Sequence, residues 1–260
     1  MRRAFTLIEL LVVIAIIALL IGILLPGLGA ARRQARAVLG ATRLQQLGVG
    51  LTMYLNDYTQ TLPQATGPGF SGEDVIVGAL FGGKKGTLPF FGIDQIGAER
   101  RPLNPYVVQR DVPPDDSSQA FELEEFHSPV DKGGTSLGVP GYENVESMYD
   151  LLGSSYTLND HALDATPGVD LFPTLVPEGG GRMPRVVQPT RTWVIGTHPI
   201  YNYDDDGDRG QRWFSSSSVQ ASVVFLDMHV GIRMDVPRGV VNSTEQYTFL
   251  PTPDWLERGP

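Results

Sequence analysis

A long apolar run near the N-terminus constrains the fold of this 260-residue chain more than any other feature. The run covers residues 5–25 and is interrupted only by Thr6, Glu9 and Gly22. At about 1.5 Å per residue, a helix of this length spans the hydrocarbon core of a bilayer. We therefore predict a transmembrane helix over residues 5–25, with the rest of the chain outside the membrane.

Glu9 is unusual within this run, because a carboxylate inside a bilayer costs roughly 2.5–3.5 kcal/mol on insertion scales. Its place near the end of the run lets snorkelling reduce that cost. A secretory signal peptide and a plain signal anchor both fit the basic Arg2 and Arg3 followed by an apolar stretch. Neither explains an acid at this position.

Residues 2–17, RRAFTLIELLVVIAII, resemble the N-terminal signature of type IV pilins and type II secretion pseudopilins. In that family a membrane-bound prepilin peptidase removes a short basic leader just before a Phe and N-methylates the new terminal amine. The resemblance implies that residues 1–4 are the leader, that cleavage falls between Ala4 and Phe5, and that Phe5 is N-methylated. The family usually has Gly where this chain has Ala4, but Ala is small enough that we expect processing.

The resemblance also implies a role for Glu9, which matches the acid that the family carries four residues after the Phe. In an assembled filament, Glu9 of one subunit pairs with the Phe5 amine of a neighbour. Removing one partner of a buried ion pair costs about 3–5 kcal/mol, so this pairing favours the assembled subunit over the lone one. We predict that Glu9 serves assembly and register, not catalysis.

The helical pattern continues after the membrane run. At Pro26 the resemblance favours a kink, and a simple helix stop is the alternative. Apolar residues then recur at three- and four-residue steps, namely Leu44, Leu47, Leu51, Tyr54 and Tyr58. We predict one helix from about residue 5 to about residue 57, with an amphipathic continuation over residues 26–58 that packs on the soluble domain.

The arginines around the membrane run bear on topology. Arg2 and Arg3 precede it, and four follow it: Arg32, Arg33, Arg36 and Arg43. The positive-inside rule alone places the C-terminal side in the cytoplasm, whereas the resemblance places it in the periplasm. We follow the resemblance, because long domains translocate largely regardless of local charge. The four arginines contact lipid headgroups or a neighbouring subunit, or they form a solvated helix face.

Residues 59–260 read as a β-rich soluble domain. Glycine and proline punctuate short runs of β-branched and aromatic residues, and the candidate strands are 154–159, 192–197, 222–228, 229–234 and 246–250. Their short spacing implies antiparallel pairing, with DMHVG (227–231) as a tight connection or bulge. We predict an α+β fold in which the long helix packs on one antiparallel sheet with long irregular loops, including an insertion at about residues 63–150.

Three further stretches are similar to elements of pilin-like proteins: YLNDYTQTLP (54–63), SYTLND (155–160) and SVVFLDMHVGIR (222–233). The last resembles the Asp-Gly-His-Val element of a pilin-like group common in planctomycete-type bacteria. That group has a His and a Gly where this chain has Ser217 and Met228, so their roles do not carry over. Asp227 and His229 match the element, and we expect them to be structural.

One acidic stretch, NYDDDGDRG (202–210), resembles the start of a calcium-binding loop. Oxygen ligands would come from Asn202, Asp204, Asp206 and Asp208, and some secretion pseudopilins hold calcium near the C-terminus. The bidentate acid expected later in such a loop is missing, because Trp213 stands there. A calcium loop and a solvated acidic turn both remain open.

Composition excludes several other functions. The chain has no Cys, so disulfides and thiolate chemistry are excluded, and its net charge of −9 argues against nucleic acid as a partner. The four His show no metal-ligand spacing, and no nucleophile, phosphate-loop or dinucleotide motif is present. We expect a solvated acidic face from five carboxylates: Asp115, Asp116, Glu122, Glu124 and Glu125.

The best single interpretation is a non-enzymatic filament subunit, a pseudopilin of a type II secretion-like system. We expect it in the inner membrane with its C-terminal domain in the periplasm, and then in a periplasmic or surface filament. The expected partners are prepilin peptidase, other pilin or pseudopilin subunits and the inner membrane. The alternatives are a type IV pilus minor pilin and a membrane-anchored periplasmic binding protein or enzyme.

Overall fold

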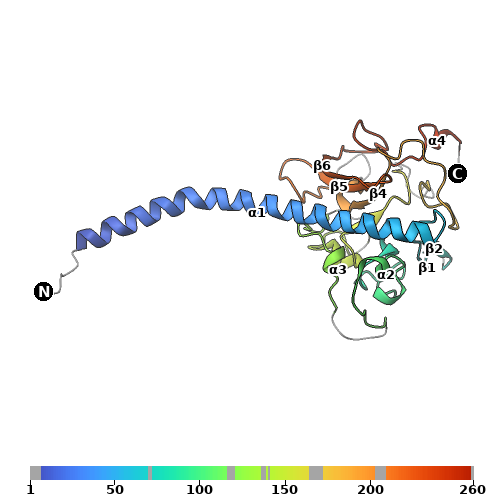
Figure 1. Cartoon of the computed structure of the whole chain (residues 1–260), viewed down its shortest axis with the longest axis horizontal. Helices are drawn as coiled ribbons and strands as arrows, with labels where there is room; N and C mark the ends of the chain where they lie inside the picture. The colour runs from blue at the N-terminus through green and yellow to red at the C-terminus, as the bar shows by residue number, and fades with distance from the viewer. Residues whose placement is uncertain are drawn as a thin grey trace.

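One continuous helix, α1 (Leu7–Asp57), is the longest element of the structure and confirms the predicted long N-terminal helix. The computed structural model describes residues 7–69, 72–115, 121–135, 139, 141–163, 172–202 and 209–258. Figure 1 shows α1 projecting far beyond the domain that surrounds its C-terminal half. Antiparallel sheets and short helices follow it in the chain, so the fold is α+β, as predicted.

The two halves of α1 differ in burial. From Leu7 to Arg36 the described side chains are exposed, apart from the half-buried Gly29. Within the described residues, α1 is the one helix that is long and apolar enough to cross a membrane. Burial starts at Ala37 and follows one stripe at helical spacing: Gly40, Leu44, Leu47, Leu51 and Tyr54. The domain therefore holds only the C-terminal part of the helix.

Pro26 lies inside α1, so the alternative of a helix stop at this residue is wrong. Because proline has no N–H, the carbonyl of Gly22 lacks the donor that another residue would supply. Figure 1 shows α1 bending within its projecting half, which contains Pro26. The assignment of a kink to Pro26 itself stays a prediction.

The main sheet has four antiparallel strands in the order β3-β4-β5-β6. These are β3 (Tyr156–Leu158), β4 (Trp193–Thr197), β5 (Gln220–Phe225) and β6 (Val230–Asp235). They fall within one to three residues of four predicted strands. The predicted tight connection joins β5 to β6, where Met228 adopts a positive φ of 69°.

The fifth predicted strand, 246–250, does not form. Thr248 makes only isolated bridges to Thr192 and Ser243. The segment instead turns its aromatic side chains into the core, where Tyr247 and Phe249 are fully buried. The apolar pattern of this segment correctly predicted that its side chains are buried. They are buried by packing on the sheet, however, and not by pairing as a strand.

Residues 63–150 form short elements that the sequence analysis did not assign. Strands β1 (Thr66–Pro68) and β2 (Asp74–Ile76) make a separate antiparallel pair. The remaining elements of the chain are short helices: η1 (Gly78–Phe81), η2 (Ala98–Arg100), α2 (Asn104–Val107), η3 (Glu124–Phe126), α3 (Met148–Leu152), η4 (His198–Tyr201) and α4 (Trp255–Arg258). Helix α2 packs against α1, so this region is joined directly to the long helix.

The main sheet is covered on both faces. Leu47 and Leu51 of α1 share one buried cluster with Val194 and Val224 of the sheet. On the opposite face, side chains of β4 and β5 form a second cluster with the C-terminal segment that contains Phe249. Because the domain packs on α1 only from Ala37 onward, the apolar half of the helix lies outside the domain.

Candidate functional site

The candidate processing and assembly site lies at the free end of α1. Glu9 stands in the first turn of the described helix and is exposed. A carboxylate in this turn also interacts favourably with the positive end of the helix dipole. Ala4 and Phe5, the predicted cleavage pair, lie outside the described residues. Figure 1 shows the N-terminal end of α1 far from the domain, and Glu9 lies in the first turn of this helix.

The projecting helix carries a long stretch without charge. No charged residue occurs between Glu9 and Arg32 in the sequence. At 1.5 Å per residue that stretch is about 33 Å long, close to the thickness of a bilayer's hydrocarbon core of about 30 Å. The length of the uncharged helix fits a single membrane crossing with Glu9 near one surface and Arg32 near the other.

The predicted calcium loop is only partly described, because Asp204, Asp206 and Asp208 lie outside the described residues. Asn202 is described and is 1% exposed, and neither its Oδ1 nor its Nδ2 has a hydrogen-bond partner among the described residues. A buried amide without partners is costly, by roughly 1–3 kcal/mol. Within the described part of the chain, no cluster of three or more His, Asp or Glu could hold a metal ion.

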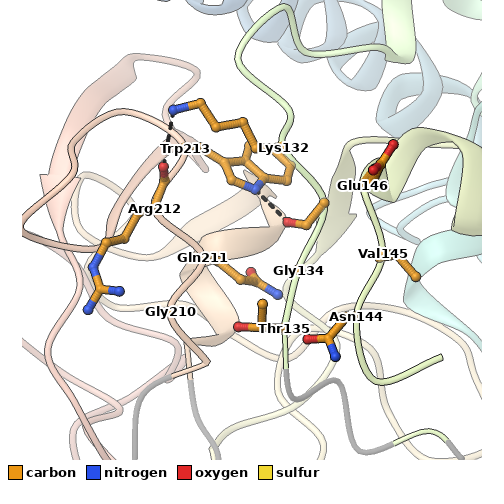
Figure 2. Close-up of a pocket in the computed structure, with 11 residues that line it drawn as sticks. Lys132, Gly134, Thr135, Asn144, Val145, Glu146, Gly210, Gln211, Arg212 and Trp213 are labelled. Carbon is orange, nitrogen blue, oxygen red and sulfur yellow. Dashed lines mark hydrogen bonds between the residues drawn. The ribbon is translucent and has the colours of Figure 1, made fainter. Parts of the chain in front are cut away.

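A cavity of about 450 Å³ lies between three loop segments of the domain. Its lining residues are Lys132–Thr135, Asn144–Glu146 and Gly210–Trp213. Trp213 Nε1 donates to the Gly133 carbonyl at 2.7 Å, which holds two of these loops together. Figure 2 shows this bond, with the side chains of Gln211, Thr135 and Asn144 gathered at the other end of the cavity.

The cavity lining combines a mainly apolar surface with a few polar groups, and the described residues in it form no catalytic arrangement. Gln211 is 4% exposed and its Oε1 has no hydrogen-bond partner. Lys132 Nζ is engaged by the Arg212 carbonyl at 3.4 Å, and Glu146 is the one carboxylate in the lining. Among the described lining residues, Glu146 therefore has no second carboxylate or imidazole beside it for acid–base catalysis.

Asn159, in the stretch SYTLND, is a structural clamp. It is fully buried, and its Nδ2 donates to the carbonyls of Trp193 at 2.9 Å and Phe249 at 2.8 Å. Thr174 Oγ1 donates to Asn159 Oδ1 at 2.7 Å. One side chain thus joins β4, the C-terminal segment and a third loop, which accounts for an Asn at the end of β3. The sequence showed the motif but not this connection.

Asp227 and His229 support the turn between β5 and β6. His229 Nδ1 lies 2.6 Å from Asp227 Oδ1, and its ring stacks on Phe225 at 4.2 Å. Gln45 Nε2 of α1 donates to the Met228 carbonyl at 3.4 Å. The turn therefore contacts the long helix directly, and the pair has the structural role that we expected.

The prediction of a solvated acidic face is correct for Glu122 and Glu124, whose side chains are exposed, and wrong for Asp115 and Glu125, whose side chains are largely covered. Four cations from separate parts of the chain meet this face: Arg43 with Glu124, Lys84 with Glu122, Arg110 with Glu125 and Arg100 with Asp115. Asp116 lies outside the described residues. Each exposed pair contributes only about 0–1 kcal/mol. The pair of Arg43 with Glu124 is the one among them that joins this segment to α1.

Arg101 is the polar residue that sequence reasoning missed most completely. It is 0% exposed, and its guanidinium donates to the carbonyls of Ala79, Gly82, Ile96 and Leu152. Burial lowers the pKa of Arg101 to about 9, which still leaves it charged at neutral pH. The side chain joins η1, the segment that contains Ile96 and the end of α3, so its role is structural.

Comparison with known proteins gives one match. A family model described as the prokaryotic N-terminal methylation motif matches residues 1–25. No curated protein and no solved structure shows significant similarity to the chain. The motif implies processing by prepilin peptidase and assembly with other pilin subunits, and with the apolar half of α1 it indicates membrane anchoring. At residues 1–25 this chain therefore carries the signature of type IV pilins and pseudopilins.

Proposed function

We propose that this protein is a non-enzymatic filament subunit, a pseudopilin of a type II secretion-like system. The observation that carries the proposal is the methylation motif at residues 1–25, placed on a helix that projects from its domain. A helix that serves only as a packing element would be buried along its length, whereas α1 is exposed from Leu7 to Arg36. Such a helix is available both to a bilayer and to the helices of other subunits.

Processing prepares this helix for assembly. Cleavage between Ala4 and Phe5 by prepilin peptidase leaves a cationic, N-methylated amine at Phe5. Glu9 follows Phe5 by four residues in the sequence, which corresponds to about one turn of a helix. In the filament, Glu9 of one subunit pairs with the Phe5 amine of a neighbour, and the pair strengthens in surroundings of low dielectric constant. The carboxylate therefore sets the axial register of adjacent subunits.

The domain would then lie on the outer surface of the filament. Since the sheet and its loops hold α1 only beyond Ala37, the projecting half can enter a helical core without disturbing the domain. We place the domain in the periplasm and the uncharged helix in the inner membrane before assembly. Its partners are prepilin peptidase and other pilin or pseudopilin subunits.

Two observations favour a secretion pseudopilin over a minor pilin of a type IV pilus. The elements that resemble secretion-type proteins, around Asn159 and around Asp227 and His229, occupy structural positions in the domain. A type IV minor pilin is the second candidate. Deletion of the gene distinguishes the two, because a pseudopilin deletion blocks export of a secreted protein and leaves surface pili and twitching intact.

Glu9→Gln tests the assembly proposal, since it removes the charge and keeps the size of the side chain. We expect processed, membrane-inserted subunits that fail to enter the sheared filament fraction. Thr52→Val is a matched control on α1, because this residue lies in the half that the domain holds and bonds only to the Gly48 carbonyl of its own helix. Normal filaments from Glu9→Gln would contradict the proposal.

Calcium binding at residues 202–208 is a secondary proposal, supported by the buried and unpartnered amide of Asn202. Asn202, Asp204, Asp206 and Asp208 would hold the ion through hard oxygen ligands, and the ion would fix the loop. The test is a calorimetric titration of the full chain with Ca²⁺ and with Mg²⁺. Saturable heat with Ca²⁺ that disappears in Asp204→Asn/Asp206→Asn supports the site, and no heat above dilution contradicts it.

A further inference from the structure

Three arginines form a distinct feature of α1 between its apolar half and the domain. Arg32, Arg33 and Arg36 are exposed, and no hydrogen bond or ion pair joins them to any other residue in the described ranges. We refer to these three residues as the arginine collar. Arg43, about two to three turns further on, behaves differently, because it bonds to Glu124 at 2.7 Å and to the His127 carbonyl.

The position of the collar along α1 is fixed by its two neighbours. The uncharged stretch of about 33 Å that begins after Glu9 ends on the N-terminal side of the collar. On the other side Ala37 is the first side chain that the domain buries. The collar therefore occupies the short length of bare helix that would leave the hydrocarbon core and pass through the headgroup layer, which is roughly 5–7 Å thick on each side.

The charge of the collar is not balanced nearby. Helix α1 carries no carboxylate between Glu9 and Asp57. The domain is opposite in sign, since 14 basic and 27 acidic residues follow position 58. Arg32 and Arg36 share one helix face and Arg33 lies about 100° around the axis, so the guanidinium groups spread over more than one side.

We propose that the arginine collar binds the phosphate groups of anionic phospholipids in the leaflet on the domain side. Guanidinium groups bind phosphate oxygens through two parallel hydrogen bonds, and each basic residue at such a surface raises the affinity about fivefold. The proposal rests on the membrane insertion of α1 proposed above. The acidic surface of a second subunit is the competing partner, but the bilayer surface is within reach of the collar in every inserted subunit, before any assembly.

This binding gives the collar a role in positioning. It fixes the depth of α1 in the membrane and holds the domain against the bilayer surface until the subunit is extracted. It also accounts for cationic residues on the side of the membrane that the positive-inside rule disfavours. Extraction into a filament must then break the collar's lipid contacts, so anionic lipid content would influence the equilibrium between membrane pool and filament.

The test measures lipid preference next to the collar. The chain has no Cys, so Ala35→Cys gives a unique site for a fluorophore among the three arginines. The mature protein, with its leader removed and its domain intact, is reconstituted into phosphatidylcholine vesicles with about 30 mol% phosphatidylglycerol. This composition gives a strongly anionic surface. Quenching by spin-labelled phosphatidylglycerol is compared with quenching by spin-labelled phosphatidylcholine. Variants are Arg32→Gln/Arg33→Gln/Arg36→Gln, the corresponding triple Lys protein, and Arg43→Gln as the matched control.

We expect phosphatidylglycerol to be preferred by about two- to fivefold at low salt, with the preference falling as salt rises. The triple Gln variant loses the preference, whereas the triple Lys variant and Arg43→Gln retain most of it. Equal quenching by both lipids in the wild type overturns the inference. So does fluorescence that depends on the protein-to-lipid ratio without lipid preference, which would indicate contact with a second subunit.

Carbonate extraction of the same vesicles separates this inference from the proposed function. Protein that resists extraction but shows no lipid preference overturns only the collar's role. Protein that is extracted, and that neither spin-labelled lipid quenches, is not inserted, and this result overturns both proposals.

Discussion

Replacement of Arg101 by Met is expected to destabilise the domain more than any other single loss of charge. The guanidinium is fully buried and donates to four backbone carbonyls at 2.9–3.2 Å. Each buried carbonyl left without a donor costs about 1–3 kcal/mol. Relief of the desolvation that lowers the pKa of Arg101 offsets part of this loss. We therefore expect a decrease of about 3–5 kcal/mol in the free energy of unfolding, a large share of typical domain stability.

Two further variants make the prediction specific. Arg101→Lys keeps the charge, but one ammonium cannot reach all four carbonyls, so we expect about half of the loss. Arg110→Met is the control, because its ion pair with Glu125 is at the surface and contributes no more than about 1 kcal/mol. Urea unfolding of the full chain in detergent micelles, followed by tryptophan fluorescence, measures all three. An Arg101→Met protein within about 1 kcal/mol of the wild type would refute the clamp.

Other consequences of the structure can be checked on the same domain. Gly153→Ala should destabilise the domain by several kcal/mol, because φ of Gly153 is 84° and the added Cβ would meet the Lys84 carbonyl. Gly179→Ala should cost only about 1 kcal/mol, because φ is 75° but the space around Gly179 is open. Thermal unfolding measures both. Asn159→Asp should cost about 2–4 kcal/mol, since it removes both donors of the clamp and buries a charge; an unchanged midpoint in urea would exclude the clamp. Burial raises the pKa of Tyr156 and of Tyr201, so the folded state keeps protons that the unfolded chain releases near pH 10. The contribution of these two tyrosines to stability should be constant below pH 10 and fall above it, as a pH series of melting temperatures for the wild type and for Tyr156→Phe would show by difference.

The elements that the sequence predicted are those with strong local signals. Helix α1 follows from an apolar run and then a stripe at helical spacing, which one stretch of sequence contains completely. Strands β3 to β6 follow from compact runs of β-branched and aromatic residues. The segment 246–250 gave the same signal but formed no strand, because its partners are single side chains such as Asn159 and not a neighbouring strand.

The 63–150 region could not be predicted, because it is held by contacts between residues distant in sequence. Asn104, for example, accepts from the Gly83 N–H at 2.8 Å and donates to the Gly83 and Ala98 carbonyls. Read alone, Arg101 is indistinguishable from a surface arginine, and the sequence around Glu124 gives no sign of its ion pair. Its partner Arg43 is far away in the sequence, so only the folded chain brings the two together.

The candidate site divides in the same way. The motif around Phe5 and Glu9 could be found from the sequence, because prepilin processing reads a linear segment that needs no folded partner. The sequence also showed four arginines after the apolar run, with lipid headgroups among their possible contacts. It could not separate the three residues of the arginine collar from Arg43, because that separation depends on where the domain begins to bury α1. That boundary, at Ala37, appears only when the sheet and the long helix are packed together.

The central claim is that this chain is a prepilin whose N-terminus is processed for assembly. The most direct test is the mass and N-terminal sequence of the protein from membranes of cells with and without the prepilin peptidase. The account predicts a mature chain that begins at N-methylated Phe5 and that is lost when the peptidase is absent. An intact Met1 in both strains, or cleavage beyond Leu25, would contradict it and leave an anchored or secreted protein outside the filament pathway.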